Sequence, residues 1–140
     1  MGNSSLTFHH IHIISEDPLE SANWYVDNLG ATFNGEKKLF NVPQIDISLS
    51  SLTILIRGRR PGETPAEAVA IKHFEGYSSH NGYGTDHFGF NYHGDMRAYC
   101  EDLRAKGVTF SVEPWEIFPG VLICYIAAPD GVSIEVMEVR

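Results

Sequence analysis

Residues 30–33 read Gly-Ala-Thr-Phe, and residues 107–110, 77 positions later, read Gly-Val-Thr-Phe. A histidine precedes each run by 20 positions, His10 in the first case and His87 in the second. The offset of 77 is about half of the 140 residues, so it indicates a duplicated unit. Duplication places the two histidines symmetrically, which favours a metal site formed between the two halves.

The composition is that of one globular domain, with 43% hydrophobic and 20% charged residues. We expect a single domain over 1–140, with one module at about 7–58, a linker at about 59–83 and a second module at about 84–140. The net charge of −8 argues against nucleic acid as a partner, because phosphate binding needs a concentrated basic surface. The one compact basic cluster is Arg57, Arg59 and Arg60. We interpret it as a solvated strand end, and binding of an anionic ligand is the minor alternative.

Each half is expected to run strand–helix–strand–strand–strand. In the first half, Asp17 and Pro18 form a helix start and Gly30 a helix stop. In the second half, Asp95 caps a helix that runs to Gly107. The predicted strands are 8–14, 31–34, 44–49 and 52–57, then 86–92, 108–113, 121–127 and 132–139.

The connector between the halves, residues 58–84, is longer than a simple link. Thr64-Pro65 predicts the start of a short helix through Ile71, and residues 76–84 read as a glycine-rich loop. His80 and Tyr83 in that loop are candidates for a lid over a cleft. Cys100 and Cys124 lack the spacing of a disulfide framework or thiolate metal site, so both are expected in the core.

The alternation of side chains along three predicted strands identifies three residues of the types that bind metal ions. Side chains on a strand point to opposite faces in turn, and each of three strands has one largely apolar face. His10, His87 and Glu135 lie on the other face of their strands. Imidazole and carboxylate together suit Fe, Mn, Co, Ni or Zn rather than Ca. The alternatives to a metal site are that the two histidines are hydrogen-bonded to the backbone and that the glutamate lies on a solvent-exposed face of the sheet.

The chain resembles the vicinal oxygen chelate superfamily, which includes glyoxalase I, extradiol dioxygenases, methylmalonyl-CoA epimerase and the fosfomycin and bleomycin resistance proteins. The resemblance covers about residues 8–34 and 84–139 and rests on the order of five motifs. These are His-Ile-His-Ile at 10–13, Ser-Ala-Asn-Trp-Tyr-Val-Asp-Asn-Leu-Gly at 21–30, Gly-Thr-Asp-His-Phe-Gly-Phe at 84–90, Leu-Arg-Ala-Lys-Gly-Val at 103–108, and Ala-Pro-Asp-Gly at 128–131 leading to Ile-Glu at 134–135. It implies an α+β fold of two paired βαβββ modules that form a curled mixed sheet around a central cleft.

Carried onto this sequence, the family's metal ligands fall on His10, His87 and Glu135. A fourth ligand, a Glu or Gln on the first module's last strand, is missing, because residues 52–56 read Leu-Thr-Ile-Leu-Ile. Tyr125 stands where extradiol dioxygenases carry a tyrosine that bonds the substrate, although an ordinary strand aromatic explains it equally well. His12 shares the face of His10 and is a candidate for an acid/base, a supporting residue or a bystander.

The resemblance implies a divalent-metal enzyme that chelates two oxygens of a small-molecule substrate. The open two-His one-Glu set favours Fe(II) and dioxygenase chemistry, with Zn, Ni, Mn and Co as alternative metals. A glyoxalase-type lyase or epimerase is the second hypothesis, and a metal-free, bleomycin-sequestering type of binding protein is the third. Fosfomycin-type thiol transfer ranks lower, since five residues follow Glu135.

We expect a homodimer, as is common in this family. The sequence shows neither an apolar run of membrane-spanning length nor a signal pattern at its start, so a cytoplasmic location without membrane association is expected.

Overall fold

A computed structural model describes residues 4–75, 77–79 and 82–139. The chain divides into two compact units, residues 1–65 and 66–140. The division falls inside the expected linker of 59–83, so that most of this segment belongs to the second unit. Each unit is described below by itself.

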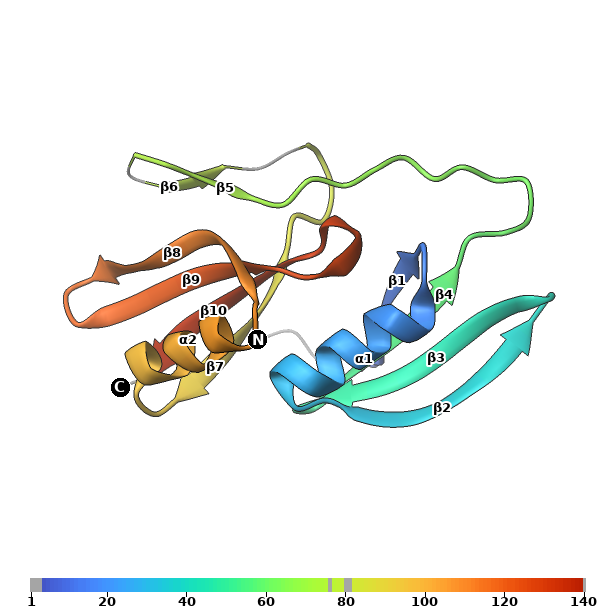
Figure 1. Ribbon diagram of the computed structural model, residues 1–140, viewed down its shortest axis with the longest axis horizontal. Coiled ribbons are helices and arrows are strands. Elements are labelled where there is room, and N and C mark those ends of the chain that lie inside the picture. Colours follow the sequence, from blue (N-terminus) through green and yellow to red (C-terminus); the bar gives the residue numbers. More distant parts are fainter. Residues whose placement is uncertain (1–3, 76, 80–81, 140) are drawn as a thin grey trace. The chain divides into compact units, whose positions relative to one another are not determined.

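The first unit is a βαβββ module built on one mixed sheet (Figure 1). Its elements are β1 (Ile11–Ser15), α1 (Pro18–Leu29), β2 (Thr32–Leu39), β3 (Val42–Leu49) and β4 (Leu52–Gly58). The strand order is β1-β4-β3-β2, with β1 parallel to β4 and the other pairs antiparallel. This is the expected order of elements, and it confirms the α+β class for this half.

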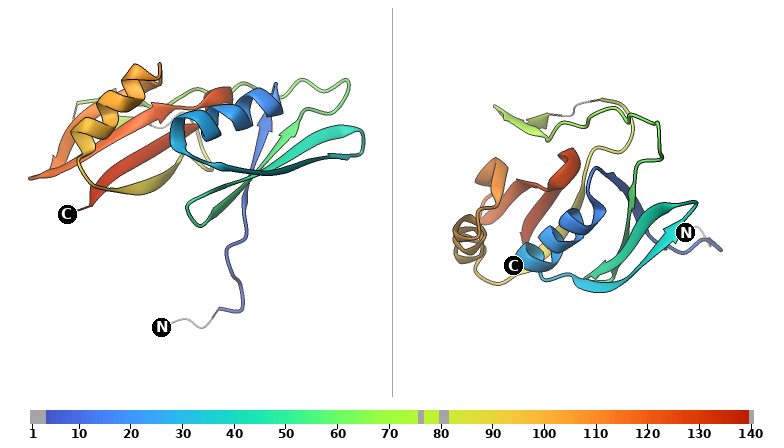
Figure 2. Two further views of the ribbon diagram at one scale, coloured as in Figure 1. Left: turned by 60° about the horizontal axis from the view of Figure 1, so that its bottom comes forward. Right: turned by 45° about the vertical axis from the view of Figure 1, so that its right-hand side comes forward.

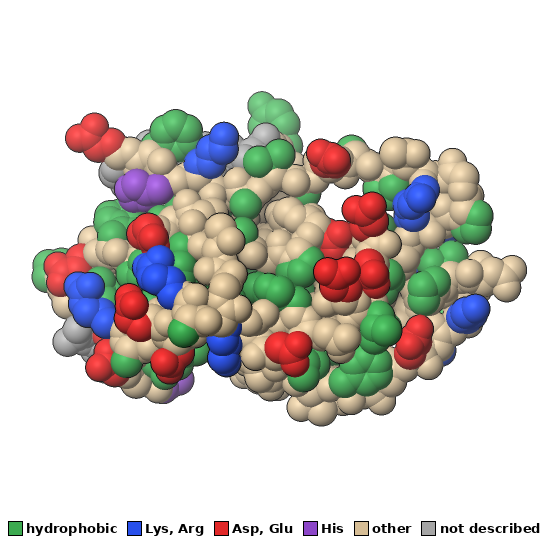
Figure 3. Space-filling view, viewed as in Figure 1, with side chains coloured by type: hydrophobic (Ala, Val, Ile, Leu, Met, Phe, Trp, Pro, Cys, Tyr) green, Lys and Arg blue, Asp and Glu red, His purple; other side chains and the backbone are tan. Residues whose placement is uncertain are grey.

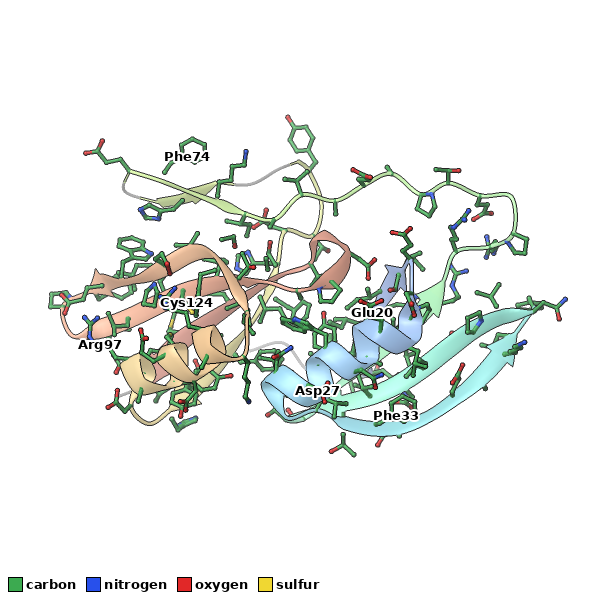
Figure 4. The ribbon with its side chains drawn as sticks, in the orientation of Figure 1. Glu20, Asp27, Phe33, Phe74, Arg97 and Cys124 are labelled. Atoms are coloured by element: carbon green, nitrogen blue, oxygen red, sulfur yellow. The ribbon has the colours of Figure 1, made fainter. Side chains whose placement is uncertain are left out.

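The helix α1 begins and ends at the predicted signals. Asp17 accepts a hydrogen bond from the Glu20 amide at 3.1 Å, and Gly30 adopts a left-handed φ of 75° that ends the helix. Ala22 and Tyr25 are fully buried against the sheet, whereas Leu19 is 48% exposed. The sheet meets this helix with isoleucines that are completely buried, Ile45, Ile47, Ile54 and Ile56. Figure 4 shows Glu20 and Asp27 projecting from α1.

The second unit repeats the module and adds a hairpin. Its module elements are β7 (Phe88–His93), α2 (Met96–Ala105), β8 (Thr109–Phe118), β9 (Val121–Ala127) and β10 (Ser133–Val139), in the sheet order β7-β10-β9-β8. A short 3₁₀ turn, η1 (Pro129–Gly131), joins β9 to β10. The hairpin consists of β5 (Lys72–Phe74) and β6 (Tyr77–Ser79), and β5 contacts β8. Phe74 projects from β5 in Figure 4.

The helix α2 covers one face of the second sheet. Asp95 caps it by accepting a hydrogen bond from the Ala98 amide at 3.1 Å. Cys100 and Leu103 on this helix are buried, and so is Cys124 on β9, which is hydrogen-bonded to Cys100. Figure 4 labels Cys124 between β9 and α2. Both cysteines are free thiols in the core, as the sequence predicts.

The connector differs from the prediction, because no helix begins at Thr64-Pro65. Residues 63–71 have no regular structure, and the expected glycine-rich loop contains β6 instead. Tertiary contacts hold this segment extended: the buried Ile71 amide donates to Ser133 Oγ at 2.9 Å. The backbone of Ala68 lies so close to Gly131 that a Cβ at position 131 would collide with it. Anchoring of this kind overrides the weak capping signal.

The strands β2 and β8 are both longer than expected. The prediction ended the first at 34, but β2 continues through the charged run 36–38 to a tight turn at Phe40 and Asn41. Strand β8 similarly continues past residue 113 to Phe118. Both are edge strands. Nearly all side chains of β2 are exposed, and β8 is interrupted by Pro114 and by register shifts, so neither keeps the apolar alternation that marks a strand in the sequence.

Candidate metal centre

The second unit brings two of the three expected ligands together. Glu135 on β10 lies opposite Gly89 of the parallel strand β7, and His87 immediately precedes β7. The Nε2 atom of His87 lies 3.1 Å from Glu135 Oε2, with the two side chains 24% and 18% exposed. Two donors that are each about 2.1 Å from one ion, at right angles, are about 3.0 Å apart. The pair therefore fits two adjacent ligands of a single divalent ion.

The other ring nitrogen of His87 is held by a carboxylate. His87 Nδ1 lies 2.7 Å from Asp86 Oδ2, and the Asp86 side chain is 17% exposed. When the ring proton is on Nδ1 and this N–H donates a hydrogen bond to Asp86, the other ring nitrogen, Nε2, has a lone pair for a metal ion. Metal-binding histidines in proteins are typically oriented in this way. Asp86 is not among the residues predicted for the site, since a residue next to a strand histidine is expected on the opposite face of the sheet. Because both residues precede β7, that rule does not apply to them.

Gly89 and Tyr125 flank Glu135 on the neighbouring strands. A Cβ at position 89 would lie 3.1 Å from the Glu135 backbone oxygen and 3.2 Å from its Cβ, so the glycine provides room for the glutamate. Tyr125 is the direct partner of Glu135 on β9, and its ring lies 5.0 Å from that of His87 at an interplanar angle of 84°. Tyr125 therefore lies beside the pair, and its role in bonding a substrate stays a prediction.

The first unit presents His10 and His12 at the start of β1. His10 is exposed and directly precedes β1, and the chain before it leads away from the sheet (Figure 2). Its Nδ1 lies 2.7 Å from Nδ1 of His9, so that one of the two rings donates to the other. The His12 ring lies 6.2 Å from the His10 ring, and His12 Nε2 is 3.5 Å from Gln44 Oε1.

Strand β4 places Leu55 where the second unit places Glu135. His12, two residues after His10, is the register partner of Leu55, just as Gly89, two residues after His87, is the partner of Glu135. The next strand contributes Asp46 beside Leu55 in one unit and Tyr125 beside Glu135 in the other. The first unit therefore has an apolar side chain, Leu55, at the position equivalent to Glu135.

Among the described residues, no three His, Cys, Asp or Glu side chains converge as the ligands of a metal ion. The expected triad takes one ligand from the first unit and two from the second, and it remains a prediction. His73 and His93 are exposed, and the His73 ring contacts Trp115 at 5.0 Å. His80 and Tyr83 are the two candidates for a lid over the cleft. Tyr83 is exposed, and His80 lies outside the described residues.

The resolved pKa shifts of the buried groups lie under α2, on the face of the second sheet that points away from Glu135. Burial, with Tyr92 stacked 4.1 Å away, raises the pKa of Tyr99 to about 12. The hydrogen bond to Cys100, together with burial, raises the pKa of the Cys124 thiol. The same hydrogen bond lowers the pKa of the Cys100 thiol. Both thiols are buried on the face away from Glu135, so neither is a candidate metal ligand for this site.

Comparison with known proteins gives the family. The model of the Glyoxalase/Bleomycin resistance protein/Dioxygenase superfamily matches residues 7–136. The chain belongs to this superfamily. A search of curated proteins found no match.

Solved structures of the glyoxalase superfamily share the fold. A glyoxylase/bleomycin resistance protein/dioxygenase domain from Frankia sp. EAN1pec has a TM-score of 0.72 at 21% identity, covering 98% of this chain and 94% of its own. A glyoxalase family protein from Enterococcus faecalis has a TM-score of 0.71 at 21% identity, covering 94% and 97%. The fosfomycin resistance protein FosX from Listeria monocytogenes, complexed with Mn(II), has a TM-score of 0.65 at 14% identity, covering 96% and 93%.

No helix in the described parts of this glyoxalase-superfamily chain is both long and apolar enough to span a membrane. Figure 3 shows acidic side chains spread over the visible face of both units, in keeping with the net charge of −8.

Proposed function

We propose that this protein is a divalent-metal enzyme that chelates two oxygens of a small-molecule substrate. His10, His87 and Glu135 would hold the ion. The observation that carries the proposal is the distance of 3.1 Å between His87 Nε2 and Glu135 Oε2, with Nδ1 of the same ring turned to Asp86. A bound divalent ion supplies Lewis-acid chemistry, which stabilises negative charge on an oxygen of the substrate. The FosX structure with Mn(II) supports a divalent ion as the cofactor.

The residues around the pair have distinct proposed tasks. Asp86 fixes the ring of His87, and Gly89 allows Glu135 to approach β7. Tyr125, 6% exposed and in contact with the His87 ring, would donate its hydroxyl proton to a substrate oxygen. His12 is the candidate base, because it shares the face and neighbourhood of His10.

Within this class we favour Fe(II)-dependent dioxygenase chemistry over lyase or isomerase chemistry. The reason is Leu55: with no carboxylate at this position, the proposed set has three protein ligands rather than four. Two histidines with one carboxylate are the arrangement of non-haem Fe(II) oxygenases, in which open positions admit both substrate and dioxygen.

The test is oxygen uptake by protein that is purified anaerobically and loaded with Fe(II), using catechol-like diols as substrates. We expect uptake in the wild type and none in His87→Ala, with Glu138→Gln as the control that removes a carboxylate from the same strand. Tight metal binding without uptake for any diol would exclude the dioxygenase. Proton exchange beside a carbonyl, lost in His12→Ala, would then support the lyase or epimerase alternative.

The expected homodimer and the cytoplasmic location also belong to this proposal. Sedimentation of the purified protein tests the first, and fractionation of source cells tests the second.

A further inference from the structure

A row of three polar side chains crosses the first sheet on the face that carries His12. Gln44 on β3 is the register partner of Lys37 on β2 and of Arg57 on β4, so all three point to the same side. Ile14 of β1 ends the row beside Arg57. Neighbouring strands are about 4.8 Å apart, so the long Lys37 and Arg57 side chains can both reach a group placed over Gln44.

The middle of this row is buried and offers a hydrogen-bond donor. Gln44 is only 8% exposed. Its Oε1 is turned to His12 Nε2 at 3.5 Å, which leaves the NH₂ group of the amide directed elsewhere. No described residue accepts a hydrogen bond from that NH₂ group. The nitrogen of this NH₂ group is not among the buried polar atoms that lack a partner, so it is open to solvent and can donate to a ligand.

The two cations of the row have no anionic partner among the described residues. Within the cluster Arg57, Arg59 and Arg60, Arg59 donates to the Glu63 carbonyl at 2.8 Å and Arg60 pairs with the Glu63 carboxylate at 3.6 Å. Arg57 is half-buried and, like Lys37, makes no hydrogen bond or ion pair with a described side chain. The nearest carboxylate on this face in register is Asp46, whose Oδ1 accepts from Asn34 Nδ2 at 3.2 Å.

We propose that Lys37, Gln44 and Arg57 bind an oxyanion group of the substrate, a carboxylate or a phosphate. Arg57 supplies a planar pair of N–H donors, Gln44 an amide donor and Lys37 a mobile positive charge. In a protein with a net charge of −8, two cations that have no anionic partner among the described residues and that flank a side-chain amide form a localised anion site. This inference rests on the proposed function in calling the ligand the substrate and in measuring the substrate's length from His10.

The geometry also gives the length of such a substrate. Arg57 lies level with Ile14, two residues beyond His12 and four beyond His10. At about 3.3 Å per residue, the anionic group would lie about 13 Å along the strand from the level of His10. The substrate would therefore be extended, with its chelating oxygens at one end and its negative charge near the other.

The test is a titration of the full-length protein with phenyl phosphate and, separately, with benzoate, followed by NMR of the Arg57 side-chain N–H and the Gln44 amide. We expect saturable shifts of both signals in the metal-free and the metal-loaded protein, and the stronger of the two probes identifies the oxyanion. Arg57→Met should weaken binding about tenfold, the usual loss for a charge-assisted hydrogen bond, and Lys37→Met should weaken it about threefold.

Two variants control for charge alone. Lys38→Met removes the neighbouring charge on the opposite face of β2, and Arg60→Met removes a nearby exposed arginine. We expect less than about a twofold change from either, as for isolated surface charges. An equal loss in Arg57→Met and Arg60→Met, or no saturable shift with either probe, would overturn the proposal. Anion binding without metal binding would instead reject the metal-enzyme function and leave this site in place.

Discussion

Strands β4 and β10 occupy the same position in the two sheets but carry different side chains at the same register. In β10, Glu135 faces Gly89 and reaches His87. In β4, Leu55 faces His12, with no carboxylate beside the first histidine on that strand. Gly89, next to the last strand, makes room for Glu135 in the second unit, whereas His12 occupies the same place in the first.

This difference favours different roles for two units that share the same topology. In the proposed site, the second unit would supply two metal ligands, His87 and Glu135, and Asp86 as the carboxylate that orients His87. The first unit supplies one histidine and, farther along the sheet, the row of Lys37, Gln44 and Arg57. Under these proposals, metal binding therefore lies mainly in the second unit and substrate recognition mainly in the first.

The largest effect is expected from removal of a ligand on β10. Loss of a residue that supports a ligand costs about 10–100-fold in metal affinity, so Glu135→Gln should cost more than about 100-fold. Titration calorimetry with Mn(II) measures this. Glu138→Gln is the matched control, because Glu138 lies three positions along on the opposite face, where it accepts from the Leu122 amide. Equal losses in both variants would contradict the assignment of Glu135.

Asp86→Ala should lower metal affinity by about 10–100-fold, because His87 then loses the partner of its Nδ1. Asp86→Glu should restore part of the affinity if orientation of the ring is the cause. The melting temperature of the metal-free protein separates this effect from a loss of folding. A drop in melting temperature with unchanged metal affinity would show that Asp86 has a structural role only.

Leu55→Glu would remove the asymmetry by placing a carboxylate at the position equivalent to Glu135. We expect metal affinity to rise about tenfold, a gain of about 1.4 kcal/mol, because a fourth ligand becomes available. Any oxygen uptake should fall as open positions are lost. Leu52→Glu on the same strand, on the other face, is the control. An unchanged affinity in Leu55→Glu would show that β4 does not face the ion.

Gly89→Ala tests the room that β7 leaves for Glu135. The new Cβ would lie 3.1 Å from the Glu135 backbone oxygen, so β10 has to move by a few tenths of an ångström. We expect metal affinity to fall a few-fold and the free energy of unfolding to fall by about 1 kcal/mol, the usual cost of mild overpacking. Gly35→Ala is the control, because a Cβ there meets nothing within 4 Å. Wild-type affinity in Gly89→Ala would remove the steric part of the comparison.

The smallest effect concerns the far face of the second sheet. Burial raises the pKa of Tyr99 from 10.0 to about 12, so the folded state holds this proton more tightly than the unfolded state. The resulting stabilisation is complete below pH 10 and is lost as the pH rises towards 12. Denaturant unfolding across this range should show a decline that Tyr99→Phe reduces, while metal affinity at neutral pH stays unchanged. A change in metal affinity would show that the two faces are coupled.

The sequence predicted the fold well because its signals are local. Asp17, Asp95 and Gly30 act on their own helices, and the repeat around His10 and His87 is visible in one dimension. It failed in the connector, where contacts of Ile71 with Ser133 and of Ala68 with Gly131 hold an extended chain in place of the expected helix.

The candidate site was predicted only in part. Strand parity and the family resemblance selected His87 and Glu135, which lie within contact distance, and they placed Tyr125 beside them. Asp86 and Gln44 were missed. The contact of Asp86 depends on how the chain enters β7, and that of Gln44 depends on the register between β3 and β4. Neither can be derived from spacing along the chain.

The central claim is that both units contribute ligands to one divalent ion. The most direct measurement is the metal content and Mn(II) dissociation constant of His10→Ala beside those of His87→Ala and the wild type. We predict one ion per chain in the wild type and a loss of more than about 100-fold in affinity in each variant. Unchanged stoichiometry and affinity in His10→Ala, with loss in His87→Ala, would contradict the shared site.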